Sequence, residues 1–267
     1  MSTGIGSLLR RVVDIREDEV PAVGWSFLYF FLVLASYFVL RPIRDQMGVA
    51  GGVDNLAWLF SGTLLGVLIL HPIFTWLVSR YPRRIFISWI YRVFILMLVT
   101  FYLLFTAADA TQSIWVGRIF FIWVSVFNLF VVSVFWSFMT DTYHSSQGKR
   151  LFGFIAVGGT IGALTGSSIT AVLVGILGPI NLLLVSALLL ELAGRASRMF
   201  ERHEGKLARV AAEEPEFEVV QAVRVDVETE EKQEEVLGGG VLEGMVNVAR
   251  SPYLLGLAGL IALFAIV

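Results

Sequence analysis

Six long runs of apolar residues constrain this chain more than any other feature of its sequence. They cover residues 21–46, 56–78, 85–106, 114–139, 152–175 and 180–199. Each approaches the roughly 20 apolar residues that an α-helix needs to cross a bilayer. A seventh run begins near Tyr253 and is still apolar at Val267, where it is too short to cross comfortably. We therefore expect an all-α membrane protein, with a six-helix transmembrane bundle and the start of a seventh helix that continues into a missing second half. For the seventh run, a short re-entrant segment is the alternative.

The composition supports membrane insertion and excludes several other classes. The chain is 57% hydrophobic and only 16% charged, and its mean hydropathy is +0.78. A net charge of −2 provides no basic field for nucleic acid. The chain has no cysteine, and its histidines are scattered, so no catalytic or metal-binding set is visible. We expect neither an enzyme nor a cofactor.

The loops predict the orientation of the bundle and its domain organisation. Most of the 20 Lys and Arg residues fall in loops on the side of the N-terminus, which places the N-terminus in the cytoplasm. Residues 1–20 have the periodicity of an amphipathic helix on the membrane surface, with a solvated tail as the alternative. Residues 21–199 form the bundle, and residues 200–240 form an acidic, flexible cytoplasmic linker, in which a short strand is the alternative. Residues 241–267 form a lead-in helix and the truncated seventh span, as in transporters built from two six-helix repeats.

Two arginines and an aspartate close the first apolar run in YFVLRPIRDQMG. Arg41 and Arg44 are three residues apart and share a helix face, and Asp45 is four residues after Arg41, with which it could pair. Because each guanidinium can bind phosphate or carboxylate through two parallel hydrogen bonds, the pair predicts an anion site. The alternative is that both side chains only reach for the membrane surface. Pro42 lies between them and favours a kink in a helix longer than the bilayer is thick.

The fourth run carries a second polar set. Arg118, Ser125 and Asn128 fall roughly on one side of the expected helix. Polar groups at this depth usually face the interior of a bundle, so we expect Arg118 and Asn128 to line the same substrate-binding cavity. For Arg118, reaching towards the membrane surface is an equal alternative.

The inner loops and the fifth run suggest how the bundle works mechanically. SRYPRR and DTYHSSQGKR place charges at inner helix ends, where they could form a gate that closes in one transport state. The alternative is that these charges only set the orientation of the helices in the membrane. The candidate gating residues are Arg80, Arg83, Arg84, Asp141, Lys149 and Arg150. Gly158, Gly162 and Gly166 recur every four residues and predict a flat face for close helix packing, along which helices could also slide.

Three segments resemble one known family. YFVLRPIRDQMG, SRYPRR and DTYHSSQGKRLFGFIAVGGTIGALTG together are similar to the ATP:ADP antiporter (nucleotide transporter) family of the major facilitator superfamily, especially its divergent bacterial members. The resemblance covers most of residues 20–200 and returns at RSPYLLGLAGLIALF. It implies twelve helices in two halves, nucleotide exchange by alternating access, and a bacterial inner (plasma) membrane.

The resemblance also implies roles for individual residues. The nucleotide carriers end their first span in a pattern like Leu-Arg-Asp-Thr-Lys-Asp. Arg41 matches its arginine, Arg44 its lysine and Asp45 its last aspartate, whereas Pro42 replaces an acid. The charge is kept but the geometry changes, because arginine is a planar fork and lysine a point charge. The loop SRYPRR keeps the basic residues of the superfamily pattern but has serine and proline where aspartate and glycine are usual.

The sequence thus predicts the first half of a major-facilitator-type carrier in the lipid bilayer, exchanging ATP and ADP or a related phosphorylated or carboxylated anion. Two alternatives remain open at this point. One is a carrier of a different small solute with the same fold, since fold does not determine function. The other is a non-transporting membrane scaffold or sensor that recruits a partner through the acidic linker.

Overall fold

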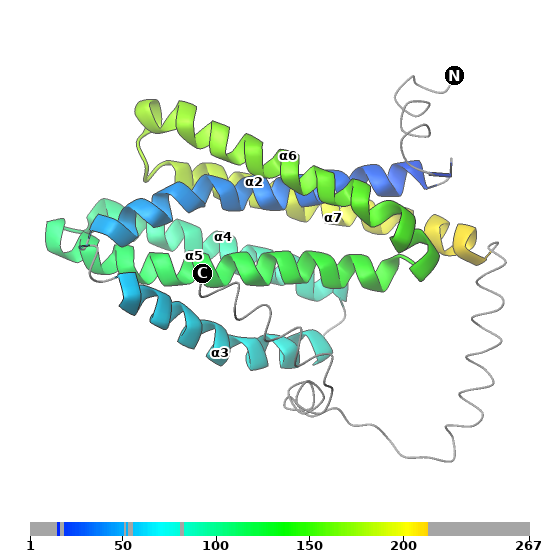
Figure 1. Ribbon diagram of the computed structural model, residues 1–267, viewed down its shortest axis with the longest axis horizontal. Helices are drawn as coiled ribbons and strands as arrows, with labels where there is room; N and C mark the ends of the chain where they lie inside the picture. Colours follow the sequence, from blue (N-terminus) through cyan, green and yellow to red (C-terminus); the bar gives the residue numbers. More distant parts are fainter. Residues whose placement is uncertain (1–14, 17–18, 51, 53–55, 81–82, 213–267) are drawn as a thin grey trace, which may run out of the picture. The chain divides into compact units, whose positions relative to one another are not determined.

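The part of the chain that the computed structural model describes, residues 15–16, 19–50, 52, 56–80 and 83–212, has only α-helical regular structure. Six helices follow one another (Figure 1): α2 (Val20–Ala50), α3 (Leu56–Arg80), α4 (Arg83–Ala107), α5 (Ala110–Thr142), α6 (Ser145–Leu177) and α7 (Leu182–Ala212). Each corresponds to one of the six apolar runs, although α7 begins two residues after the start of the run 180–199. The expected all-helical character is therefore confirmed for the described residues, whereas the six-helix transmembrane bundle and its major-facilitator arrangement stay predictions.

Among the described residues, four helices are long and apolar enough to cross a membrane. They are Val20–Ala50, Trp89–Ala107 within α4, Ala110–Thr142 and Ser145–Leu177. These lengths and compositions are those of a multi-pass integral membrane protein. In α3 the apolar stretch Leu56–Pro72 is shorter. Helix α7 differs for another reason, because Glu191, Arg195 and Arg198 all fall within residues 182–199.

Helix α2 packs mainly against three other helices and lightly against α3. Its main neighbours are α5, α6 and α7, while α4 packs on α7 and α5, and α3 packs mainly on α5. Helix α2 has 31 residues and remains helical through Pro42. Its length of about 46 Å exceeds a hydrocarbon core of about 30 Å, so it either tilts or extends beyond that core.

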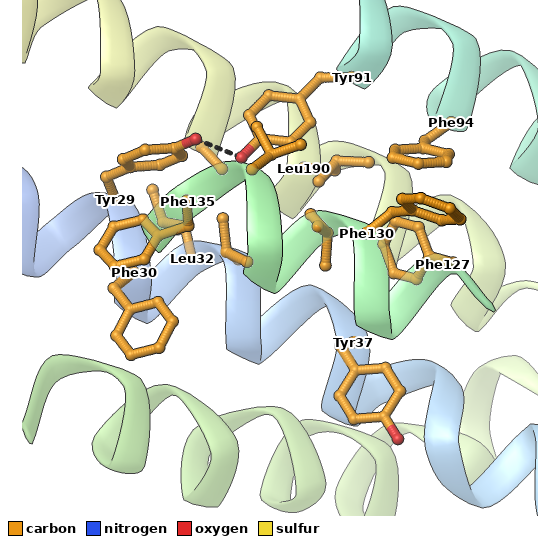
Figure 2. Packing of buried hydrophobic residues seen from close by; sticks show 14 of the residues in the cluster. Tyr29, Phe30, Leu32, Tyr37, Tyr91, Phe94, Phe127, Phe130, Phe135 and Leu190 are labelled. Atoms are coloured by element: carbon orange, nitrogen blue, oxygen red, sulfur yellow. Dashed lines mark hydrogen bonds between the residues drawn. The ribbon is translucent and has the colours of Figure 1, made fainter. Parts of the chain in front are cut away.

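Aromatic rings fill the contact between α2 and α5. Phe30 stacks on Phe135 with ring centroids 4.1 Å apart, and Tyr29 meets the same ring edge-on at 5.0 Å. Figure 2 shows the hydroxyl of Tyr29 directed at that of Tyr91 on α4, with which it forms a buried hydrogen bond. This bond satisfies two hydroxyls in an otherwise apolar core, where an unpaired polar group would be costly.

Helix α6 lies on α2 through its glycines. A Cβ atom at Gly158 would lie 2.7 Å from the carbonyl oxygen of Phe27. At Gly162 and Gly166 the nearest atoms would be the carbonyl oxygens of Phe31 and Ala35. Only glycine allows two helix backbones to approach this closely.

Polar bonds hold α2 in register at both sides. On the α7 side, the hydroxyls of Ser36 and Ser186 lie 2.8 Å apart, and that of Ser186 also donates to the Ser36 carbonyl oxygen at 2.9 Å. On the α6 side, the Thr170 hydroxyl donates to the carbonyl oxygen of Val39 at 3.1 Å. Each bond satisfies a hydroxyl that is buried between helices.

The structure differs from the sequence-based boundaries at the end of the bundle. Helix α7 continues to Ala212, so residues 200–212 of the predicted flexible linker are helical. The rest of the linker, most of the predicted N-terminal helix and residues 241–267 lie outside the described residues.

Candidate functional site

Arg44 turns from α2 towards α5. Its guanidinium carbon lies 5.1 Å from the centre of the Phe121 ring, and its Nη1 donates to the hydroxyl of Ser125 at 3.4 Å. This direction follows from the packing one turn further along α2, where Gly48 lies against Phe121. The Arg44 side chain is therefore largely covered, at 17% exposure, rather than extended away from the bundle.

Asp45 pairs with its immediate neighbour. Its Oδ1 accepts hydrogen bonds from Nη2 of Arg44 at 2.6 Å and from Nε at 2.9 Å. The pairing with Arg41, which the four-residue spacing had made possible, does not form. Asp45 is half exposed, so this ion pair is partly screened by solvent.

Arg41 is the exposed member of the arginine pair. Its guanidinium carbon lies 5.5 Å from the centre of the Phe38 ring, and among the described residues no carboxylate pairs with it. Since Phe38 packs beside Gly166 of α6 while Arg44 faces α5, the two arginines lie on the side of α2 between α5 and α6. That side carries more positive than negative charge.

Arg118 contributes a third guanidinium from α5. It lies over the Trp115 ring at 4.6 Å, and the side chain is only partly buried. Its Nε, however, is fully buried and has no hydrogen-bond acceptor among the described residues. Arg118 is one turn before Phe121 on α5. Because the Arg44 guanidinium lies over the Phe121 ring, Arg44 approaches α5 one turn away from Arg118.

Asn128 lies one turn beyond Ser125. The Ser125 hydroxyl donates to the Phe121 carbonyl oxygen at 2.8 Å, and it also accepts the bond from Arg44. The Asn128 side chain is partly buried, and within the described part of the chain nothing hydrogen-bonds to it. Its direction differs from that of Ser125 by about 60° around α5, so the two polar groups do not form one strict line.

Arg41, Arg44, Arg118 and Asp45 are treated as one candidate cationic site, in which Arg44 is covered and Arg41 is exposed. Arg41, Arg44 and Arg118 contribute three positive charges, and Asp45 contributes one negative charge. Each guanidinium lies over an aromatic ring, which holds it in place while leaving its edge N–H groups able to bind an acceptor. Among the described residues no group of His, Cys, Asp and Glu side chains could hold a metal ion.

The predicted gating residues lie away from this site. Arg80, Asp141 and Lys149 are exposed at helix ends, while the side chains of Arg83 and Arg84 are outside the described residues. Their meeting across a gate therefore stays a prediction.

Arg150 binds an acid that the sequence analysis did not single out. Its Nη2 donates to Oε1 of Glu19 at 3.1 Å, and the Glu19 side chain is completely buried. The amide of Gln147 and the backbone N–H of Arg16 also donate to this carboxylate, at 3.1 and 3.0 Å. The available signal was an acid directly before a long apolar helix, since a charge at such a position requires a partner.

No protein-family model, curated protein or solved structure matches this chain.

Proposed function

We propose that this chain is part of a membrane carrier that binds a small anion at Arg41, Arg44 and Arg118 and moves it by alternating access. The multi-pass helical character provides the membrane setting. The excess of guanidinium groups over carboxylates makes the site selective for negative charge. Alternating access requires the same site to bind in two conformations, and a site formed between two helices can meet that condition.

The buried Nε of Arg118 is the observation that carries the proposal. A charged N–H group that is removed from water without an acceptor costs free energy. A phosphate or carboxylate oxygen would supply this acceptor and recover that cost in a conformation that uncovers Nε, such as the second state of an alternating-access carrier. The guanidinium groups of Arg44, from α2, and of Arg118, from α5, would then contact the anion, with Ser125 and Asn128 of α5 contributing neutral polar groups.

Nucleotides are the first solutes to test. The resemblance of YFVLRPIRDQMG to the ends of first spans in ATP:ADP antiporters supports this choice. The planar guanidinium groups also favour oxygen pairs such as those of a phosphate or a carboxylate, so other phosphorylated and carboxylated anions belong in the same panel.

The test measures binding and uptake by the full chain in vesicles. Radiolabelled ATP, ADP and a panel of organic anions are compared for the wild type, Arg44→Ala and Arg118→Ala. The matched control is Arg92→Ala, since Arg92 is an exposed arginine on α4. A hydrogen bond to a charged group contributes about 1.5–3 kcal/mol, so each site variant should bind about 10- to 100-fold more weakly while the control binds normally.

Two results would refute this function. One is a wild-type chain that is correctly inserted but binds none of the anions. The other is a double variant, Arg44→Ala with Arg118→Ala, that binds as tightly as the wild type. Uptake of a neutral solute that is unaffected by both substitutions would instead support a carrier of a different class.

A further inference from the structure

The outward side of α7 changes from apolar to basic along one line. Leu184, Leu188 and Leu192 are 40%, 60% and 36% exposed. The same side of the helix continues with exposed arginines, because residues three, four and seven positions apart lie one above another. We call this line the α7 outer stripe; it consists of Leu184, Leu188, Leu192, Arg195, Arg198 and Arg202.

The opposite side of α7 is committed to the bundle. Leu190 and Phe200 are fully buried, and the Phe200 ring meets that of Phe138 on α5 with centroids 5.3 Å apart. Ser186 bonds to α2. These contacts fix the rotation of α7, so the outer stripe is directed away from the core of the bundle.

A helix that entered the hydrocarbon core at Leu182 would bring the arginines of the outer stripe close to the opposite membrane surface. From Leu182 to Arg202 the helix rises about 30 Å, which equals the thickness of the hydrocarbon core. Arg198 and Arg195 are then about 6 and 10 Å further inside. Arginines that face lipid at this depth are unfavourable unless their long side chains reach a polar partner.

The protein itself supplies few polar partners for these arginines. Glu191 Oε1 accepts from Nε of Arg195 at 3.1 Å and lies 3.8 Å from Nη2 of Arg198. Arg198 also donates from Nε to the Gly194 carbonyl oxygen at 3.1 Å. Within the described residues one carboxylate therefore serves the outer stripe.

Arg202 has the weakest partner of the three arginines. Its one contact with another side chain in the described part is from Nη1 to the sulfur of Met199, at 3.7 Å. A thioether is a weak acceptor. Three guanidinium groups thus face outward with a net positive charge, and the side chains of Arg195 and Arg198 remain 64% and 44% exposed.

We propose that the α7 outer stripe binds the phosphate groups of anionic phospholipids. The leucines lie against acyl chains, and the arginines meet headgroups at the end of the same line. Each guanidinium can bind a phosphate through two parallel hydrogen bonds. The unbalanced positive charge favours lipids with a net negative charge over zwitterionic ones. The site is separate from the anion site between α2 and α5 and does not depend on the transported solute.

The experiment compares lipid binding to the full detergent-purified chain by native mass spectrometry. Phosphatidylglycerol is the anionic probe and phosphatidylcholine, with the same acyl chains, is the zwitterionic one. The variants are Arg195→Gln/Arg198→Gln/Arg202→Gln and the triple lysine substitution at the same positions. Arg92→Gln removes an exposed arginine from α4 and is the control.

A basic residue near a charged membrane surface contributes about 1 kcal/mol, which is about a fivefold change in affinity. The triple glutamine variant should therefore lose roughly a hundredfold in its preference for phosphatidylglycerol. The lysine variant should keep most of that preference, and the control should keep all of it.

Equal retention of both lipids by the wild type would overturn the proposal, and so would an unchanged preference in the triple glutamine variant. If that variant does not fold, Arg202→Gln alone decides, because its contact within the protein is weak. It should lower the preference about fivefold, and an unchanged preference would count against lipid binding at this stripe.

Discussion

Replacing glycine by alanine, which adds one methyl group, should have opposite effects on stability at different glycines of α6. Gly162 is buried against the backbone of α2, and a Cβ atom there would overlap the carbonyl oxygen of Phe31. Gly153 and Gly175 lie on the same helix, and a Cβ atom at either would have nothing within 4 Å. The three positions therefore separate the effect of helix contact from the effect of alanine on the helix itself.

The size of the effect follows from the geometry. Ordinary contact begins near 3.4 Å, whereas a Cβ atom even at Gly158 would lie 2.7 Å from a carbonyl oxygen. The overlapped atom at Gly162 belongs to the backbone of α2 and cannot rotate away, so the whole helix must shift. Such overpacking costs up to about 3 kcal/mol, and alanine recovers about 1 kcal/mol of helix propensity. Gly162→Ala should thus destabilise the chain by about 2 kcal/mol, whereas Gly153→Ala and Gly175→Ala should stabilise it by up to about 1 kcal/mol.

The measurement is reversible unfolding of the purified chain in mixed detergent micelles, followed by circular dichroism. Each variant is compared with the wild type at the same detergent ratio. A Gly162→Ala chain as stable as the wild type would show that α2 and α6 are not in close backbone contact. Equal destabilisation by Gly153→Ala would show that the loss comes from the helix and not from its packing.

Three further predictions concern polar groups. Arg150→Gln leaves the buried Glu19 carboxylate with neutral donors and should lower the free energy of unfolding by about 3 kcal/mol. Adding Glu19→Gln should recover part of this stability. A double-mutant cycle that shows no coupling between the two residues would contradict the prediction. Burial raises the pKa of Tyr143 above its ordinary 10.0, despite the 2.9 Å bond to Ser26, so its contribution to stability is complete below pH 10 and declines above it. Tyr143→Phe should reduce the loss of unfolding free energy above pH 10 by up to about 1.4 kcal/mol per pH unit. If the wild type and the variant lose stability equally as pH rises, this prediction is refuted. Asp45→Asn removes the acid that pairs with Arg44 and should strengthen binding of a small anion about two- to fivefold; weaker binding would indicate that Asp45 orients the arginine instead.

The helices could be located from the sequence because helix formation depends on residues that are close together in the chain. A helix satisfies its backbone hydrogen bonds within itself, and an apolar run of sufficient length indicates a helix that can cross a membrane. The run 114–139 lies within α5 (Ala110–Thr142). Asp109 caps the start of this helix, and its side chain accepts a hydrogen bond from the backbone N–H of Gln112 at 2.8 Å. The spacing of Gly158, Gly162 and Gly166 likewise showed from the sequence that they share one face.

Partners far apart in the chain could not be derived in this way. Asp45 pairs with Arg44 and not with Arg41. Arg44 is at the same time held by Ser125 and Phe121, and these contacts exist only because α5 packs on α2. Glu19 looked like an ordinary charge before a helix, because its partner Arg150 is 131 positions away.

The amino-acid sequence by itself thus determined that this protein is helical, apolar enough to enter a membrane and rich in arginine at the end of its first apolar run. The tertiary structure decided which guanidinium is covered, which carboxylate is buried and which side of α7 faces outward. The physical reason is distance: helix formation depends on neighbours within a few residues, whereas the burial and pairing of a charge depend on helices that meet only after folding.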